Sequence, residues 1–535
     1  MDKQDSRLSI VKQTCSNPDG FGQYHRFRES VQHEMKRRLY APAVLFVGLL
    51  SAQIVATAHV YLSNLDLLQA TEAVMRTGYL AVPNARVTEH LNSLATAMAG
   101  GLLFTLSIGA GLSLFTLICA WLWDRAFGRR RKAVFFYLML WAAGLALVND
   151  NGLNIVASLY LVVVPLVTGV AAIQLLPART TLVSPAGAFW PVSAAIILAL
   201  LWGLVLDRHM FSNIRDHLLL ENRAGRSITD AYYAYTLFPA EAFKSLEQKQ
   251  IRTCVLGSSL DRANWIRLER TARAHDYLPL PAGFPADLTI GRDTDKNRFS
   301  LENNQRTVLS VPDGEFLRSP DKILAAYSNH LDRNRMFRTL TLACLLLGFP
   351  LVLFSFLFSV LGALPNLFLT VAVSDVIAAV FCIVVGGILL VPVYQGHTAT
   401  VSPASPAIAF SSPSATTRIA ALRQACEDRR DIAMDAKTHG LEKSPHIAER
   451  YWLARSLAWS KDPAAQTMLL ALADDAVPIV VCQALWAMGE RRNQSAIQEI
   501  IDRINTSPHW YIQMYGYRAL RTLGWVQPQS PQLSY

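Results

Sequence analysis

One carboxylate lies in a stretch of chain that is otherwise apolar. Asp375 follows Ser374 inside the apolar run from Leu367 to Tyr394. An ionisable residue at membrane depth is costly, so it suggests a functional site such as a step in a proton or cation pathway. A structural ion pair, or a position nearer the membrane surface, is the alternative interpretation.

A second polar group follows another apolar run. Asn149, Asp150 and Asn154 lie between the runs that end at Val148 and begin at Leu153. Their side chains could bind a cation or a polar head group. A tight turn between two helices also requires residues of this kind, and we favour that explanation.

Other chemistry has little support in the sequence. There is no phosphate-binding Walker A motif, no H-E-x-x-H motif and no G-x-S-x-G motif. A membrane haem needs paired histidines, and only His59 lies clearly within an apolar run, so we expect no metal and no cofactor. Five carboxylates between the fifth and sixth runs could serve acid/base chemistry, although their spacing is that of a solvated face: Asp261, Glu269, Asp276, Asp293 and Asp295.

The elements that carry these residues are predicted to be membrane helices. The chain is 52% hydrophobic and 17% charged, whereas soluble domains have about 25% charged residues. Most of the apolar runs reach the roughly 20 residues that cross a hydrocarbon core. The seven predicted spans are Ala41–Leu62, one within Leu94–Trp123, Ala133–Val148, Leu153–Leu176, Ala188–Leu206, Phe337–Leu361 and Leu367–Tyr394.

The charges beside these runs predict the orientation. Lys and Arg concentrate in the N-terminal segment and in the loop 124–132, whereas the opposite short loops contain only Arg76 and Arg86. Because cytoplasmic loops carry the excess of Lys and Arg, we expect the N-terminus in the cytoplasm. The same rule explains the net charge of +10, so we expect a lipid bilayer and no nucleic acid as the partner of the basic residues. An odd number of spans would place both soluble parts outside the cytoplasm.

The predicted organisation is a membrane α-helical bundle with an external α+β domain and a C-terminal all-α solenoid. Two short strands, Leu288–Gly291 and Thr307–Val311, and a helix that starts at Ser319 and continues into the sixth span indicate the α+β domain. The expected parts are a basic N-terminal segment 1–40, a five-helix block 41–206, the external domain 207–336, a two-helix unit 337–394, a Ser/Pro/Ala linker 395–414 and the solenoid 415–527.

The C-terminal part repeats a helical pattern. Residues 484–489 read Ala-Leu-x-x-Met-Gly, residues 519–524 read Ala-Leu-x-x-Leu-Gly, and residues 454–459 are a degenerate copy. Each unit leaves an apolar stripe that only a neighbouring unit can cover. We expect alanine to allow close helix approach and glycine to end the first helix of each unit. The signature residues are Ala484, Leu485, Met488, Gly489, Ala519, Leu520, Leu523 and Gly524.

This segment resembles the HEAT-like repeat family, particularly the short form found in phycobilin lyases. The resemblance covers about residues 415–525 and implies a protein-binding solenoid, without implying lyase activity. We therefore expect a non-enzymatic scaffold in a bacterial inner membrane, which docks a protein partner through these repeats. The alternatives are a transporter or membrane-assembly component that uses Asp375, and a membrane enzyme acting on lipid or glycan.

Overall fold

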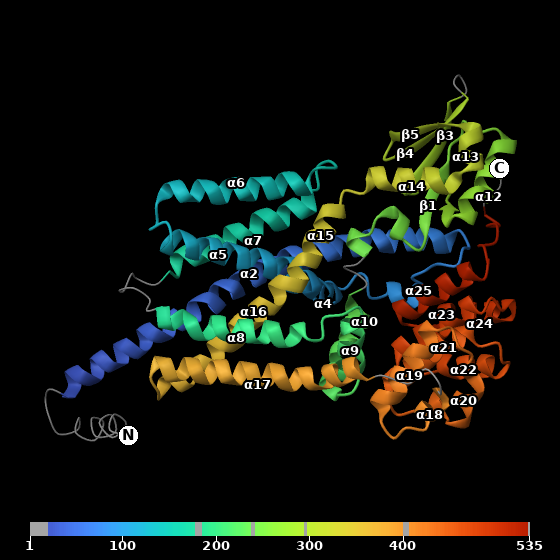
Figure 1. Cartoon of the computed structure of the whole chain (residues 1–535). Helices are drawn as coiled ribbons and strands as arrows, with labels where there is room; N and C mark the ends of the chain where they lie inside the picture. The colour runs from blue at the N-terminus through green and yellow to red at the C-terminus, as the bar shows by residue number, and fades with distance from the viewer. Residues whose placement is uncertain (1–19, 177–184, 237–240, 294–296, 400–405, 533–535) are drawn as a thin grey trace.

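The computed structural model is a helical bundle with two further domains at one end. It describes residues 20–176, 185–236, 241–293, 297–399 and 406–532. Figure 1 shows the N-terminus at one end of the bundle, and a β-sheet domain and a C-terminal helical domain together at the other end. We call these two domains the head. Three basic residues of the N-terminal segment, Lys3, Arg7 and Lys12, lie outside the described residues, as do Arg179 and Asp295.

Each predicted apolar run contains a helix. Among the described residues, five helices are long and apolar enough to cross a membrane, whereas the apolar parts of α6 and α8 are shorter. The bundle helices are α2 (Gly20–Arg76), α4 (Leu94–Phe104) continuing through the π-helical turn η1 (Thr105–Gly109) into α5 (Ala110–Arg125), α6 (Arg131–Val148), α7 (Ile155–Gln174), α8 (Pro185–Gly203), α15 (Arg335–Ala343) continuing through η4 (Cys344–Gly348) into α16 (Phe349–Ala363), and α17 (Val371–Thr398).

Helix α2 connects the bundle to the head. Its 57 residues span about 86 Å at roughly 1.5 Å per residue, which far exceeds a hydrocarbon core of about 30 Å. At its far end, Ala73 and Val74 share a buried cluster with Leu278 and Leu280 of the sheet domain. The helix therefore forms a stem that fixes the sheet domain to the bundle (Figure 1).

Glycine allows a close helix crossing inside the bundle. A methyl group on Gly348 would lie 2.8 Å from Gly111 Cα, so the backbones of η4 and α5 are in contact there. Small residues at such crossings are typical of membrane helices, because lipid supplies no hydrophobic force between them and close packing must do so.

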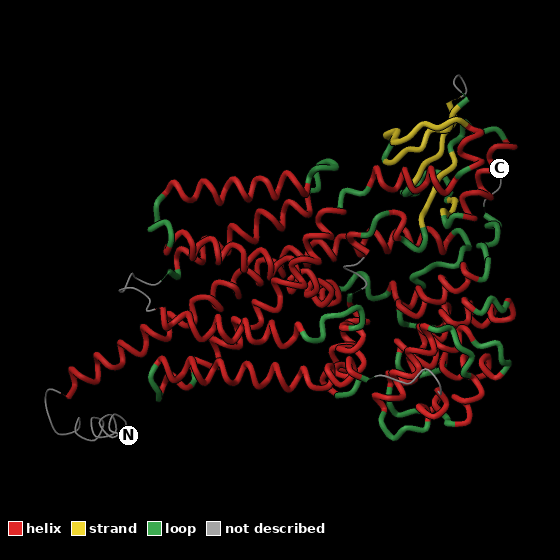
Figure 2. Tube along the Cα trace, in the orientation of Figure 1, coloured by secondary structure: helices red, strands yellow, loops and turns green. Residues whose placement is uncertain are grey.

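The sheet domain contains one mixed sheet, with the strand order β2-β1-β3-β4-β5 (Figure 2). Strand β1 is parallel to β2 and β3, and the last three strands form antiparallel pairs. Buried Phe299, Phe316 and Tyr327 join the sheet to its helices. The elements are β1 (Arg252–Leu256), α12 (Arg262–Ala274), β2 (Tyr277–Pro279), β3 (Leu288–Asp293), β4 (Arg298–Asn303), β5 (Arg306–Pro312), α13 (Asp313–Arg318) and α14 (Pro320–Leu331).

The two predicted strands are present as β3 and β5, and the helix predicted to start at Ser319 is α14. The prediction that this helix continues into the sixth span was wrong. Helix α14 ends at Leu331, and α15 begins at Arg335. Asp332 interrupts the helix and accepts a salt bridge of 2.6 Å from Arg338, which replaces the helical backbone contacts at the junction.

The C-terminal domain consists of stacked helix pairs. Helices α19, α21, α23 and α25 pack side by side in one row, α22 and α24 pack against that row, and α20 packs against α22. Helix α10 is followed by η3 before the sheet begins, and α17 precedes the C-terminal domain in the chain. The remaining elements are α3 (Ala85–Thr88), α9 (Met210–Asn213), the π-helical turn η2 (Ile214–Leu219), α10 (Arg223–Tyr235), η3 (Leu246–Gln248), η5 (Pro365–Leu367), α18 (Pro406–Phe410), α19 (Ala415–Glu427), α20 (Ala433–Thr438), η6 (Leu441–Lys443), α21 (Ile447–Ser456), η7 (Leu457–Trp459), α22 (Ala464–Ala473), α23 (Pro478–Glu490), η8 (Gln494–Ala496), α24 (Ile497–Thr506) and α25 (Trp510–Thr522).

Candidate interaction face of the C-terminal repeats

The row α19-α21-α23-α25 is built from the repeat signature. Six signature residues, Ala484, Leu485, Met488, Ala519, Leu520 and Leu523, are buried. A methyl group on Gly489 would lie 2.9 Å from Ala519 Cα, so this glycine allows α23 and α25 to approach closely. Gly524 follows the end of α25 with φ +81, the left-handed conformation typical of a helix-ending glycine. Helix termination thus applies to Gly524, whereas Gly489 serves packing.

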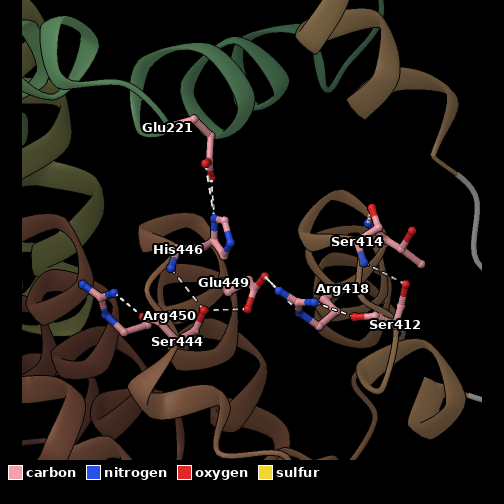
Figure 3. Close-up of polar contacts among 9 residues, drawn as sticks. Glu221, Ser412, Ser414, Arg418, Ser444, His446, Glu449 and Arg450 are labelled. Atoms are coloured by element: carbon pink, nitrogen blue, oxygen red, sulfur yellow. Dashed lines mark hydrogen bonds and ion pairs between the residues drawn. The ribbon is translucent and has the colours of Figure 1, made fainter.

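Buried ion pairs hold neighbouring helices together. Glu449 on α21 is 1% exposed and accepts hydrogen bonds from Arg418 of α19 and from Ser444 (Figure 3). The Arg450 guanidinium donates to Ser444 O and to Asp475, which precedes α23. Arg418 therefore joins α19 to α21, and Arg450 joins α21 to the turn before α23.

The π-helical turn η2, between the bundle and α10, contacts the same row. Asp216 is 0% exposed and accepts a 2.7 Å hydrogen bond from the Trp452 indole. Arg215 lies 3.8 Å from the Tyr451 ring centroid and pairs with Asp216 at 2.6 Å. At the edge of this contact, the His446 imidazole lies 3.2 Å from Glu221 (Figure 3). A desolvated carboxylate with two partners fixes the orientation of the repeats on the bundle.

The loop after the stem helix forms a second contact. The Asn84 side-chain Nδ2 donates to Ile504 O at 2.7 Å. The Asn84 backbone N–H donates to Gln513 Oε1 at 2.9 Å. Gln527 exchanges two hydrogen bonds with the backbone of Leu80. Backbone groups of the loop 77–93 are thereby satisfied by the repeats, and the repeats are tied to the stem.

A run of tyrosines on α10 covers part of the row. Tyr233 meets Tyr511 at a ring-centroid distance of 4.9 Å and an interplanar angle of 82°. The Thr236 hydroxyl lies 3.4 Å from the Tyr511 hydroxyl. Burial raises the pKa of the Tyr511 hydroxyl to about 12, so it remains protonated at neutral pH. This half of the row is consequently occupied by the protein's own chain.

The other half of the row borders a cleft of about 550 Å³. The opposite wall belongs to the segment before β1, to β1 itself and to the turn before β2. We call this space the interdomain cleft. Its lining residues are Glu247, Lys249, Gln250, Arg252 and Asp276 from the sheet domain, and Arg455, Gln483, Trp486, Tyr515, Tyr517, Arg518, Arg521 and Thr522 from α21, α23 and α25.

Asp276 closes one end of the interdomain cleft. It accepts hydrogen bonds from the Tyr517 hydroxyl at 2.8 Å and pairs with Arg521 at 3.1 Å. Burial raises the pKa of the Asp276 carboxyl, and the contacts with Arg521 and Tyr517 oppose that shift. The carboxylate is therefore committed to the contact between the two domains.

Comparison with known proteins identifies the C-terminal domain. Its residues 434–521 match the model of HEAT repeats. These residues are HEAT repeats. The match covers α21 to α25 except the last residue, together with most of α20, and it confirms the resemblance inferred from the repeated signature. A search of curated proteins found no match to the chain, and neither did a search of solved structures.

Asp375 lies close to the start of α17, near the bundle end that is remote from the head (Figure 1). Its carboxylate pairs with Arg38 at 2.7 Å, and both side chains are about nine-tenths buried. Arg38 also donates to Val371 O at 3.0 Å. The geometry joins α2 to α17 and is compatible with the structural ion pair named above as an alternative to a pathway residue.

The polar group at the α6–α7 turn is satisfied by the protein. Asn149 donates to Leu145 O at 2.8 Å, and Asn154 caps α7 by accepting from the Ala157 amide at 3.0 Å. Asn154 also donates to Asn334 at 2.7 Å, which ties this turn to the start of α15. Asp150 is exposed. These contacts are those of a turn that positions three helices.

Three of the carboxylates considered for acid/base chemistry are held by different arginines. Glu269 pairs with Arg273, and Asp261 lies 3.2 Å from Arg292. Asp276 pairs with Arg521 of the repeats. Only Asp276 borders the interdomain cleft.

The sequence argument missed the cleft itself. Arg252 and Arg518 are separated by more than half of the described chain and meet only because the head folds back on its stem. The available signal was the presence of Arg455, Trp486 and Arg518 on successive repeat helices.

Proposed function

We propose that the chain crosses the membrane seven times, with its N-terminus in the cytoplasm and its head outside. The five long apolar helices support this, and α6 and α8 lie alongside them in the bundle (Figure 1). Helix α5 ends at Arg125, and its connection to α6, which contains Arg129 and Arg130, lies at the end of the bundle away from the head (Figure 1). An excess of basic residues marks the cytoplasmic side, so the head belongs on the opposite side.

We further propose that the head is a membrane-anchored docking module for another protein. HEAT repeats form protein-binding solenoids in many unrelated proteins. Here one half of the repeat row is covered by η2 and α10, whereas the other half borders the interdomain cleft. The observation that carries this proposal is the wall of that cleft, to which three successive repeat helices contribute side chains.

The fixed orientation of the head supports docking rather than free movement. The repeats are held by Asp216 below, by the loop 77–93 at the side and by Asp276 at the sheet domain. A binding site formed between two domains is preorganised when both domains are held in place, and preorganisation lowers the entropic cost of binding.

Site-specific photo-crosslinking in native membranes tests the proposal. A photoreactive amino acid at Thr522, which is exposed and lines the cleft, is expected to capture a partner protein. The same amino acid at Gln498, which is exposed on α24 away from the cleft, is the matched control and is expected to capture little. Equal yields at both positions, or no protein adduct at Thr522, would contradict the proposal.

The transporter alternative depends on Asp375. Its pairing with Arg38 supports a structural role, because the carboxylate already has a cationic partner and both side chains are largely buried. The enzyme alternative depends on external carboxylates, of which Glu269, Asp261 and Asp276 are engaged in ion pairs. The docking module therefore remains the preferred proposal.

A further inference from the structure

The interdomain cleft is strongly cationic. Five of its lining residues are basic and two are acidic. Asp276 is committed to Tyr517 and Arg521, and Lys249 pairs with Asp287 at 2.9 Å. The remaining arginines, Arg252, Arg455 and Arg518, have no carboxylate within salt-bridge distance among the described residues. Glu247 is the second acidic residue of the lining, so the basic groups outnumber the acidic ones and the cleft keeps a net positive charge.

These arginines are held in place by neutral groups. The Arg455 guanidinium lies 4.9 Å from the Trp486 ring centroid and its Nη1 donates to the Tyr451 hydroxyl at 3.3 Å. The Arg252 guanidinium lies 4.7 Å from the Tyr277 ring centroid. Aromatic contacts orient a guanidinium without neutralising it, so its charge stays available to a ligand.

The basic residues come from opposite walls. Arg252 begins β1, whereas Arg455 and Arg518 lie on α21 and α25. A ligand that meets all three must carry negative charges at several points along its length. Arginine binds a planar carboxylate through two parallel hydrogen bonds, so a series of carboxylates matches this arrangement.

The uncharged part of the lining suits a peptide. Gln250 accepts a hydrogen bond of 3.2 Å from Arg518, and its side-chain N–H groups can still donate to a peptide carbonyl. Gln483 and Thr522 add further amide and hydroxyl groups to the lining. Tyr515 and Trp486 are half-buried and supply rings on which apolar or aromatic side chains can pack. A single phosphate group would use neither feature.

We propose that the interdomain cleft binds an acidic, extended peptide segment of the partner protein. Aspartate or glutamate side chains of the segment pair with Arg252, Arg455 and Arg518, and an intervening aromatic side chain packs against Trp486 and Tyr515. This inference rests on the proposed docking function and specifies the chemistry of the partner.

The test measures peptide binding to the full chain in detergent by fluorescence anisotropy. The probe is a short fluorescein-labelled peptide of alternating glutamate and tyrosine, and the reference peptide has glutamine in place of glutamate. We expect the acidic peptide to bind more tightly and its affinity to fall as salt is added. Arg518→Glu is expected to weaken binding about tenfold or more, as for the loss of a hydrogen bond between charged groups.

The matched control is Arg267→Glu, which makes the same change of charge on an exposed face of α12 outside the cleft. It is expected to leave the affinity nearly unchanged. Equal affinity for both peptides, or an equal loss in both variants, overturns the inference. So does tighter binding to vesicles of anionic phospholipid that Arg518→Glu abolishes, because the cleft would then serve lipid.

The two proposals fail separately. If a photoreactive group at Thr522 captures a protein while Arg518→Glu changes neither that capture nor peptide affinity, the acidic-segment inference is wrong and the docking function stands. If the acidic peptide binds as expected and Thr522 captures no protein in membranes, the cleft chemistry stands and the docking function is wrong.

Discussion

The membrane bundle and the HEAT repeats are both stacks of helices, but they treat polar and apolar side chains in opposite ways. Bundle helices expose large apolar residues such as Leu347, at 70%, and Phe136, at 69%. The repeats bury their apolar residues and place charged pairs such as Arg418 and Glu449 between helices. The same secondary structure therefore follows two patterns. Apolar side chains are exposed on helices that are long and apolar enough to cross a membrane, and they are buried in the repeats.

The comparison also explains how each region achieves specificity. In the bundle, close glycine contacts such as Gly111 with Gly348 align the helices. In the repeats, buried arginine–carboxylate pairs define the register between units, since a shifted neighbour would leave a buried charge unpaired. The head is attached in a related way at η2, where Asp216 pairs with Arg215 and accepts a hydrogen bond from Trp452.

Removal of a buried repeat carboxylate should have the largest effect. Glu449→Ala leaves Arg418 desolvated without its partner and is expected to lower the stability of the repeats by about 3–5 kcal/mol. The change is measured by thermal unfolding of the purified chain, with the susceptibility of the head to proteolysis as the readout. Asp502→Asn is the control, because Asp502 is exposed on α24, and it should change stability by less than about 0.5 kcal/mol. A similar loss of stability in both variants would show that the buried pair of Arg418 and Glu449 does not stabilise the repeats.

The attachment of the head should be the next most sensitive feature. Asp216→Asn weakens the contacts with Arg215 and Trp452 and is expected to cost about 2–3 kcal/mol, as for a charged hydrogen bond in a desolvated site. The expected result is faster proteolytic release of the repeats with unchanged helix content in the bundle. Loss of the bundle together with the head would show that the two regions are not separable in this way.

Glycine substitutions compare packing in the two regions. Gly489→Ala places a methyl group 2.9 Å from Ala519 Cα and is expected to destabilise the repeats by about 1–3 kcal/mol through overpacking. Gly387 of α17 has no atom within 4 Å of an added methyl group, so Gly387→Ala should be neutral or slightly stabilising. Both values come from thermal unfolding, and equal effects would contradict the packing role of Gly489.

The ion pair of Asp375 with Arg38 tests whether the bundle and the head can be perturbed separately. Asp375→Asn is expected to lower bundle stability by about 2 kcal/mol, because Arg38 loses its charged partner. Photo-crosslinking at Thr522 should be unaffected, since the pair lies at the bundle end remote from the head (Figure 1). If Asp375→Asn abolishes the cellular function while the bundle remains stable, the transporter alternative is supported instead.

Acidification should have the smallest effect. Burial lowers the pKa of His217 below its ordinary value of 6.5; Asp216 and Glu221 oppose this shift, whereas Arg423 and Arg215 contribute to it. The stability that neutral His217 contributes is therefore present above pH 6.5 and is lost as the pH falls through the lowered pKa. Proteolytic release of the head should accelerate in that range, and His217→Asn should reduce the pH dependence. An unchanged dependence in the variant would assign it to other groups.

The sequence predicted those features that depend on local pattern. The apolar runs identified the bundle helices, and the spacing of Ala484 and Ala519 identified the HEAT repeats. Strands β1 and β2 escaped prediction because they are short and carry no regular alternation. Strand β4 was missed although buried Phe299 and Leu301 alternate with polar residues. The contact of Trp452 with Asp216 joins residues 236 positions apart, and no local rule predicts such a contact. The interdomain cleft depends on several contacts of this kind.

The account depends most directly on which side of the membrane carries the head. Thr522 lines the interdomain cleft, and Ala126 follows α5 at the opposite end of the bundle. A cysteine is introduced at each position, as Thr522→Cys and Ala126→Cys. A membrane-impermeant maleimide applied to intact cells measures their sidedness. We predict labelling of Thr522→Cys in intact cells and of Ala126→Cys only after permeabilisation. Labelling of Ala126→Cys alone in intact cells would place the head in the cytoplasm and contradict the account.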